Sequence, residues 1–422
     1  MARPPRNRLV GHRRLMGTST SAPAGGEAAQ EEEHGSSQDS VKIMVSVLVV
    51  VIFCTLFYCV YCWRWRKRNA VRRTETESLR RMSSSELPLT DLASIHAATG
   101  NFSTANKLGE GGFGPVYRGV LPGGVEIAVK RLSARSRQGA EEFRNEVELI
   151  AKLQHRNLVR LVGWCAEHDE KLLVYEYLPN RSLDAFLFDS SMSAQLDWNT
   201  RHNIILGIAR GLLYLHEDSL LKVVHRDLKA SNVLLDNKMN PKISDFGLAR
   251  IFKEECIAVN TGRVVGTYGY MAPEFVMEGV FSVKSDVFGF GVLLLEILSG
   301  KRNGIVYLEE HQQSLIQDAW TLWVEDKADE FMDAALGQSY SMDEAWRCFL
   351  VGLLCVQDDP DVRPTMSSVL LMLASDHMNL PAPSRPLRNV PLSAPSSARR
   401  SSDPSVSLKS INYASITAVQ PR

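Results

Sequence analysis

An uncharged run of about twenty apolar residues, 43–62, limits the fold of this chain more than any other feature. A run of this length matches an α-helix that crosses the hydrocarbon core of a bilayer. Trp63 and Trp65 follow as interfacial aromatic residues, and arginine and lysine crowd 64–73. A buried core helix is the alternative, and these flanks argue against it. Because cationic flanks stay cytosolic, the sequence predicts one transmembrane helix whose C-terminal side lies in the cytosol.

The segments on either side of this run are polar. Residues 1–40 are rich in Gly, Ser, Ala and Glu, so we expect a disordered extracytoplasmic arm. The arm contains no cysteine and no apolar stretch of signal-peptide length, so neither a disulfide-stapled module nor a cleavable leader is expected. Residues 63–101 are expected to form a basic juxtamembrane segment and linker that attracts anionic lipid. The tail 376–422 is rich in Ser, Pro and Arg and is expected to be disordered.

A glycine-rich motif, G-x-G-x-x-G-x-V, lies within 108–117. Glycines let backbone amides come close to phosphate oxygens. A dinucleotide-binding Rossmann loop or a plain hairpin would look similar on this motif alone. A Rossmann loop needs a helix to begin inside the motif, whereas Pro115 interrupts it and β-type residues follow at 125–132. We therefore expect the loop to join two antiparallel strands and to clamp a nucleotide.

The next charged candidate is Lys130, which lies among apolar neighbours in the strand predicted at 126–132. A lysine in such a place needs an anionic partner. Apolar residues of the helix predicted at 139–153 define one packing face. Glu146 lies next to that face, whereas Glu142 is expected to be solvated. We therefore predict a Lys130–Glu146 ion pair, the alternative being an ordinary surface lysine.

Two acidic motifs follow in order: H-R-D-L-K-A-S-N at 225–232, and then D-F-G at 245–247. Two acids and an amide at this spacing suit a site that holds metal-bound phosphate beside a hydroxyl group. We expect Asp227 to orient the acceptor hydroxyl and take its proton, and Lys229 to steady the γ-phosphate. Asn232 and Asp245 are expected to hold Mg²⁺, since hard oxygen ligands suit that ion.

Taken together, the motifs of about 101–374 resemble those of eukaryotic protein kinases. The phrases N-E-V-E-L-I-A-K-L-Q-H-R-N-L-V-R-L at 145–161 and G-T-Y-G-Y-M-A-P-E at 266–274 are similar to plant receptor-like kinases, especially the S-domain and cysteine-rich groups. The resemblance implies an α+β, two-lobed kinase domain at 102–375, preceded by one transmembrane helix. The small lobe, 102–178, would hold an antiparallel sheet and one helix, and the large lobe, 179–375, would be mainly α-helical.

The resemblance also implies ATP as the phosphate donor, with Mg²⁺ or alternatively Mn²⁺. It implies serine and threonine as acceptors, because Lys229 lies within D-L-K-x-S-N. The activation segment, residues 245–274, would contain two candidate phosphorylation sites, Thr261 and Thr267. Thr267 is also expected to contact the catalytic loop, residues 225–232. The residues expected to contact ATP are Leu108, Gly109, Glu110, Gly111, Gly112, Phe113, Gly114, Val116, Ala128 and Lys130, with Tyr175, Glu176, Tyr177 and Leu178 at the hinge between the lobes.

Four further residues have structural roles in the kinases that this chain resembles. Arg226 would pair with a phosphate on the activation segment. Asp286 would brace the catalytic loop from below, and Glu274 would pair with Arg363. Gly289 stands where that family usually has serine, a departure that should weaken its helix slightly.

The sequence therefore predicts a receptor-like serine/threonine protein kinase of plant cell-surface signalling. It would cross the plasma membrane once, with its N-terminus outside and its kinase domain cytosolic. Expected partners are protein substrates, other receptor kinases or a second copy of the chain, and membrane lipid. Lys and Arg together number 48, as do Asp and Glu, so no net charge indicates nucleic acid.

The alternative to a kinase is a non-catalytic, pseudokinase-like partner or truncated co-receptor that acts as a scaffold. The ectodomains usual in the S-domain and cysteine-rich groups are missing from 1–40, which motivates this alternative. Loss of Lys130, Asp227, Asn232 or Asp245 would favour it, and all four residues are intact.

Overall fold

The computed structural model of the chain describes residues 32–82, 88–111, 114–132, 137–167, 170–252, 259–260, 264–304, 314–337, 340–375 and 378–386. By compactness the chain divides into two units, residues 1–74 and 75–422. Gly112, Phe113 and Thr261 lie outside the described residues, as do most of the predicted arm and most of the predicted tail.

A single long helix, α1 (Glu32–Met82), contains the predicted transmembrane run. Within the described part of the chain, Val41–Lys67 is the one stretch long and apolar enough to cross a bilayer, by length and composition, and none of it is buried in the protein. The helix is longer than predicted. Residues 32–40, expected to be disordered, and 63–82, expected to be a linker, are helical. No proline interrupts the segment, and a helix nucleated in the apolar run extends at little cost per residue.

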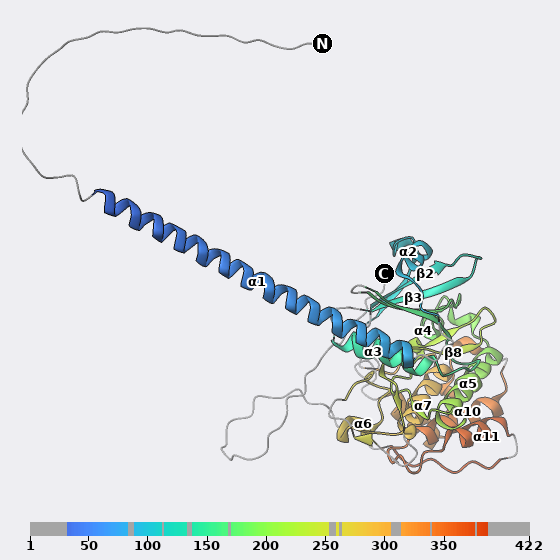
Figure 1. The fold of residues 1–422 in the computed structure, drawn as a ribbon. Helices are drawn as coiled ribbons and strands as arrows, with labels where there is room; N and C mark the ends of the chain where they lie inside the picture. The colour runs from blue at the N-terminus through green and yellow to red at the C-terminus, as the bar shows by residue number, and fades with distance from the viewer. Residues whose placement is uncertain are drawn as a thin grey trace, which may run out of the picture. The chain divides into compact units, whose positions relative to one another are not determined.

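Five antiparallel strands form the sheet of the small lobe, in the order β1-β2-β3-β5-β4. Figure 1 labels two of them, β2 and β3. Val116 lies opposite Lys130, which in turn lies opposite Leu173. The predicted antiparallel pairing of the strands around the loop is therefore confirmed, and the Rossmann alternative is excluded because a strand, not a helix, follows the glycine-rich turn. The strands are β1 (Lys107–Gly111), β2 (Gly114–Val120), β3 (Glu126–Leu132), β4 (Leu161–Glu167) and β5 (Glu170–Glu176).

Two helices accompany this sheet, α2 (Leu92–Thr99) and α3 (Arg137–Ile150). α2 begins where the Asp91 carboxylate accepts the N–H of Ser94, as helix N-termini favour. α3 buries its predicted apolar face, but Glu142, expected to be solvated, is only 2% exposed. That expectation was wrong because α3 packs against the turn Phe246–Leu248 as well as the sheet, which places Glu142 against Gly247.

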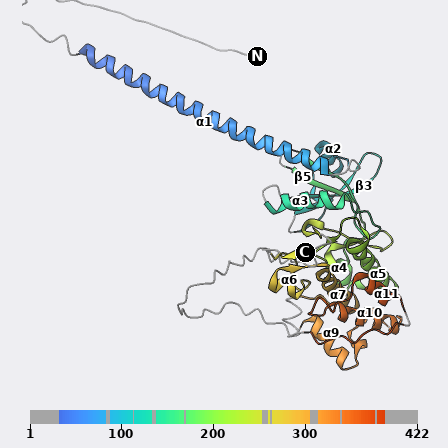
Figure 2. The same ribbon diagram turned by 60° about the horizontal axis from the view of Figure 1, so that its bottom comes forward.

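The large lobe is mainly helical, and Figures 1 and 2 show α7, α10 and α11 together on the side away from the sheet. Every residue of α7 from Asp286 to Ser299 is buried, as expected for a helix at the centre of a core. The helices are α4 (Leu183–Leu187), α5 (Trp198–Leu213), α6 (Pro273–Glu278), α7 (Val283–Ser299), α9 (Leu315–Val324), α10 (Met342–Cys355) and α11 (Met366–Ala374).

Short strand pairs lie between these helices and shape the loops that carry the acidic motifs. β6 pairs with β9, β7 with β8, and β10 with β11. The strands are β6 (Val223–Val224), β7 (Val233–Leu235), β8 (Pro241–Ile243), β9 (Arg250–Ile251), β10 (Val259–Asn260) and β11 (Val280–Phe281).

The beginning of the predicted disordered tail is ordered against the large lobe. Within 378–386, Leu380 packs against the core, and the N–H of Ser384 donates to Oε1 of Gln357 at 2.9 Å. The kinase fold therefore extends past the predicted boundary at residue 375, because an apolar residue and a backbone hydrogen bond continue the packing beyond the last helix.

Gly289 offers a stability test inside α7. A Cβ there would lie 3.4 Å from the carbonyl oxygen of Tyr270 and 3.6 Å from that of Leu228, which are ordinary contact distances. We expect Gly289→Ala to raise the free energy of unfolding by roughly 0.5–1 kcal/mol, because alanine loses less backbone entropy in a helix than glycine. Chemical denaturation followed by tryptophan fluorescence measures the change.

Gly291, two residues later in the same helix, is the matched control. A Cβ at Gly291 would lie 2.6 Å from Cβ of Cys355, so Gly291→Ala should lower the free energy of unfolding through overpacking. Equal destabilisation by both substitutions would contradict this account of α7.

Candidate active site

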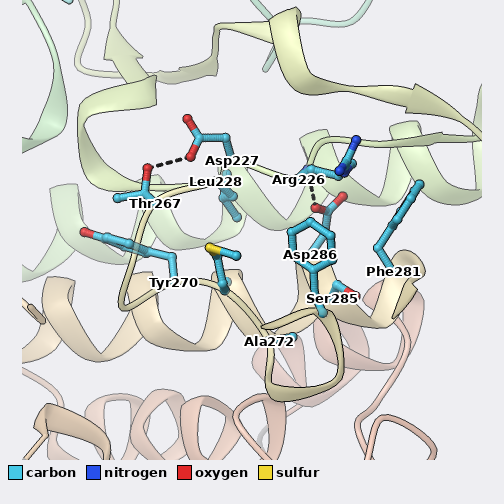
Figure 3. Close-up of a pocket in the computed structure, with 12 residues that line it drawn as sticks. Arg226, Asp227, Leu228, Thr267, Tyr270, Ala272, Phe281, Ser285 and Asp286 are labelled. Carbon is cyan, nitrogen blue, oxygen red and sulfur yellow. Dashed lines mark hydrogen bonds between the residues drawn. The ribbon is translucent and has the colours of Figure 1, made fainter. Parts of the chain in front are cut away.

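The segment 225–232 carries the first acidic motif, and a carboxylate from α7 holds it. Oδ2 of Asp286 accepts the N–H of His225 at 2.7 Å. Oδ1 of Asp286 accepts the N–H of Arg226 at 2.8 Å (Figure 3). Nε2 of His216 lies 3.0 Å from Oδ2. Burial works to raise the pKa of Asp286, but the hydrogen bond from His216 and the electrostatic influence of His216 and His225 keep this pKa below its ordinary value. The predicted bracing contact is confirmed.

Asp227 lies at the centre of a hydrogen-bond cluster. Its Oδ1 accepts the hydroxyl of Thr267 at 2.6 Å (Figure 3). Its Oδ2 accepts Nζ of Lys229 at 2.8 Å and Nδ2 of Asn232 at 3.0 Å. Nζ of Lys229 also donates to Thr267 at 2.8 Å, so the predicted contact of Thr267 with the catalytic loop is confirmed. These bonds fix the direction in which the carboxylate points.

A second charged cluster joins the sheet, α3 and the D-F-G segment 245–247, which we call the metal loop. Nζ of Lys130 lies 2.7 Å from Oε1 of Glu146 and 2.8 Å from Oδ1 of Asp245. The hydroxyl of Tyr175 donates to the other oxygen of Glu146. Burial works to lower the pKa of Lys130, but the two carboxylates outweigh it and raise this pKa above its ordinary value. The predicted ion pair is present, and Lys130 is charged at neutral pH.

The glycine-rich turn has the space that a phosphate cradle needs. Among the described residues, a Cβ at Gly109 or Gly111 would meet no heavy atom within 4 Å apart from its chain neighbours. At Gly114, where φ is 123°, a Cβ would lie 2.2 Å from the carbonyl oxygen of Arg131, so only glycine fits. The described glycines around the turn therefore differ: space is open at Gly109 and Gly111, whereas Gly114 is closely packed.

The remaining candidate nucleotide contacts come from adjacent strands. Ala128 lies opposite Tyr175 in the β3–β5 pair. Glu176 ends β5, and Tyr177 and Leu178 follow without helix or strand. The other residues with predicted ATP contacts are in or beside β1 and β2: Leu108, Glu110 and Val116.

Asn232 and Asp245 fit a magnesium ion that would be coordinated partly by these two side chains and partly by the phosphates of a bound substrate. In the described ranges, no group of three or more His, Cys, Asp and Glu side chains is placed to hold a metal. Nδ2 of Asn232 donates to Asp227, which leaves Oδ1 of Asn232 as the atom available to a cation. Mg²⁺ is commonly held by one or two protein oxygens together with substrate phosphates and water, and this donor set suits that arrangement.

The activation segment is tied to the large lobe by a buried ion pair. Nη1 and Nη2 of Arg363 donate to the two carboxylate oxygens of Glu274 at 2.9 and 2.8 Å. The side chain of Arg363 is fully buried. The predicted Glu274–Arg363 pair is therefore confirmed, in the two-pronged geometry that arginine favours with carboxylates.

Arg226 is a half-buried cation whose hydrogen-bond donors are only partly used. Its guanidinium lies over the rings of Phe281 and Phe275, at 4.3 and 5.1 Å. Nε and Nη2 have no hydrogen-bond partner among the described residues. Burial, and then the charge of Arg250, lower the pKa of Arg226 to about 10. An anion from the activation segment would find unfilled donors here.

One network in the site was missed from the sequence. The hydroxyl of Tyr270 donates to both oxygens of Glu296, at 2.8 and 2.7 Å, and the N–H of Asn303 donates to Oε1 at 2.7 Å. Nδ2 of Asn303 donates to the carbonyl of Gly269 at 2.8 Å. A single acid inside the apolar run 287–298 was the signal that could have revealed it, since a buried carboxyl group needs partners.

The carboxyl group of Glu296 gives the site a testable pH dependence. Burial raises the pKa of Glu296 to about 8. Because the native state binds this proton more tightly than the unfolded state, its contribution to stability is complete below about pH 4.5 and is lost as pH rises through about 8. Glu296→Gln should remove roughly 2–4 kcal/mol of the fall in unfolding free energy between pH 5 and 8.5. Denaturation at a series of pH values measures it, and parallel curves for both proteins would contradict the assignment.

Comparisons with known proteins agree with this geometry. The model of the protein tyrosine and serine/threonine kinase family matches residues 102–373. A G-type lectin S-receptor-like serine/threonine-protein kinase of Arabidopsis thaliana is 58% identical over 317 residues, which are 74% of this chain and 37% of that protein. The S-receptor-like kinase B120 of Arabidopsis thaliana is 51% identical over 388 residues, 85% of this chain and 46% of that protein. Cysteine-rich receptor-like protein kinase 11 of Arabidopsis thaliana is 49% identical over 368 residues, 85% of this chain and 55% of that protein.

The chain thus spans from about a third to just over half of the length of these relatives. The family match covers more than half of the chain itself. The chain therefore belongs to the protein tyrosine and serine/threonine kinase family.

Proposed function

We propose that the chain is a membrane-anchored, receptor-like serine/threonine protein kinase of plant cell-surface signalling. It transfers the γ-phosphate of ATP to serine and threonine hydroxyls of protein substrates and of itself. One observation carries this proposal: the carboxylate of Asp227 is held by Thr267, Lys229 and Asn232. A carboxylate with a fixed direction beside a lysine is what a phosphoryl acceptor needs.

The residues divide the reaction between them. ATP bound with Mg²⁺ would supply the γ-phosphoryl group, and ADP would be the leaving group. Lys130 contacts the α- and β-phosphates, while Asn232 and Asp245 hold the metal. Asp227 orients the acceptor hydroxyl and takes its proton, and Lys229 neutralises charge on the γ-phosphate. The acceptor oxygen bonds to phosphorus as the bond between phosphorus and the β–γ bridging oxygen breaks.

The acceptor class follows from Lys229 and from the relatives. Lys229 contacts the Asp227 carboxylate and lies within the motif D-L-K-x-S-N, which implies serine and threonine acceptors by resemblance. The two S-receptor-like relatives are named serine/threonine-protein kinases. Serine and threonine are therefore the proposed acceptors.

The domain plan and location are part of the proposal. Residues 43–62 cross the plasma membrane, 63–101 contact anionic lipid through their basic cluster, and 102–375 act in the cytosol. The N-terminus lies outside. Other receptor kinases or a second copy of the chain are the proposed partners, and a phosphate on Thr261 would pair with the unfilled donors of Arg226.

The scaffold alternative gains no support from the site. A pseudokinase-like partner would tolerate a broken Lys130–Glu146 pair or a displaced Asp245, yet all three side chains are in contact. No described contact favours a non-catalytic role.

A phosphate-transfer assay tests the proposal. The full-length protein in detergent, with radiolabelled ATP and Mg²⁺, should label itself and an added protein substrate. Asp227→Asn should lower the rate at least about a hundredfold, since it removes the proton acceptor.

Asp326→Asn is the matched control, because Asp326 is an exposed loop residue with a φ of 56° that asparagine also tolerates. It should keep the wild-type rate. Wild-type labelling by Asp227→Asn, or no transfer by the folded wild-type chain, would contradict the proposal.

A further inference from the structure

The side chain of the hinge residue Glu176 is hydrogen-bonded to Lys242, a residue of the large lobe, and to the backbone of Arg160. Its Oε1 accepts Nζ of Lys242 at 3.0 Å and the N–H of Arg160 at 2.8 Å. The N–H of Glu176 donates in turn to the carbonyl of Arg160 at 3.1 Å. The side chains of Lys242 and Glu176 are only 15% and 22% exposed. Backbone and side chain of the hinge are therefore bound to the same neighbours.

Lys242 lies in the middle of β8, and β8 is bound to the same segment, 157–160. The N–H of Val159 donates to the carbonyl of Ile243 at 2.9 Å, and the N–H of Ile243 donates to the carbonyl of Asn157 at 2.8 Å. Nδ2 of Asn157 donates to the carbonyl of Pro241 at 2.9 Å. The segment 157–160 is thus hydrogen-bonded to the hinge on one side and to β8 on the other.

The residue after β8 continues this path to the metal loop. The N–H and the hydroxyl of Ser244 both donate to the carbonyl of Asn232, at 2.8 and 2.9 Å. Nε2 of His225 lies 3.0 Å from the carbonyl of Ser244. Asp245 follows Ser244 directly in the chain, so hydrogen bonds and neighbouring residues together link Glu176 to Asn232 and Asp245, the two proposed metal ligands.

We propose that Lys242 is a positioning residue for the nucleotide. Its ion pair with Glu176 sets the hinge, where the adenine ring binds, at a fixed distance from Asn232 and Asp245, where the phosphates and metal bind. The inference rests on the proposed function, because it takes ATP as the ligand that joins these two ends.

The physical reason is preorganisation. A ligand that contacts two subsites loses less binding energy to ordering when the protein already holds those subsites at the right separation. Without Lys242, the carboxylate of Glu176 keeps only the N–H of Arg160 as a donor, and the hinge gains freedom relative to β8. Ligands that reach both ends should suffer more than ligands that reach only the hinge.

The test uses full-length protein in detergent and Lys242→Met, which keeps the aliphatic length and removes the charge. Calorimetry with Mg²⁺-ATP and with adenosine measures affinity, and steady-state assays measure KM and kcat. Because the pair is partly exposed, we expect the Kd and KM for ATP to rise on the order of three- to tenfold. The Kd for adenosine and the kcat at saturating ATP should change less than about twofold.

Three comparisons separate positioning from loss of fold. Glu176→Gln should weaken ATP binding similarly, and the double variant should be no weaker than either single variant, as expected for one shared interaction. Lys242→Arg should keep wild-type affinity. Lys327→Met, which removes an exposed pair with Glu325 in the large lobe, is the matched control and should also bind normally.

Each contrary outcome has one meaning. Unchanged ATP affinity in Lys242→Met, equal losses for ATP and adenosine, or additive losses in the double variant would overturn the inference. Because binding needs no turnover, a wild-type chain that binds ATP but transfers no phosphate would overturn the proposed function and leave this test intact. A folded wild-type chain that binds no Mg²⁺-ATP would overturn both.

Discussion

The buried carboxylate of Asp286 is the constraint on which the active site depends. The loop 225–232 has little regular structure of its own, and Arg226 adopts a φ of 69°, which is unfavourable for arginine. Asp286 accepts the N–H groups of His225 and Arg226 from the first turn of the most buried helix. The strained backbone persists because this contact ties it to the core. The contact thereby also fixes the backbone position of Asp227, the next residue.

Charge balance explains how the site is ready for its ligands. Lys130 is shared by two carboxylates, those of Glu146 and Asp245. A divalent cation beside Asp245 would add positive charge to this cluster and favour the phosphates of a nucleotide. Arg226 does not belong to this cluster, and its Nε and Nη2 have no hydrogen-bond partner among the described residues. It is therefore suited to bind a phosphate added to the activation segment.

Much of the site could be predicted from the sequence because short motifs carry it. The pairs Lys130–Glu146 and Glu274–Arg363 join residues of recognisable motifs, and both are present. The burial of Glu142 could not be predicted, because it depends on how α3 meets a turn about a hundred residues later. The Glu176–Lys242 pair spans 66 positions and leaves no local pattern. The extension of α1 was missed because polar composition was taken to outweigh helix propagation.

Phosphoamino-acid analysis of the wild-type chain after incubation with radiolabelled ATP and Mg²⁺ tests the central claim most directly. The proposed function, supported by the motif around Lys229 and by the serine/threonine-protein kinases among the relatives, predicts label on serine and threonine. Label confined to tyrosine, or none on a folded chain that binds ATP, would contradict the assignment of this site to serine/threonine phosphorylation.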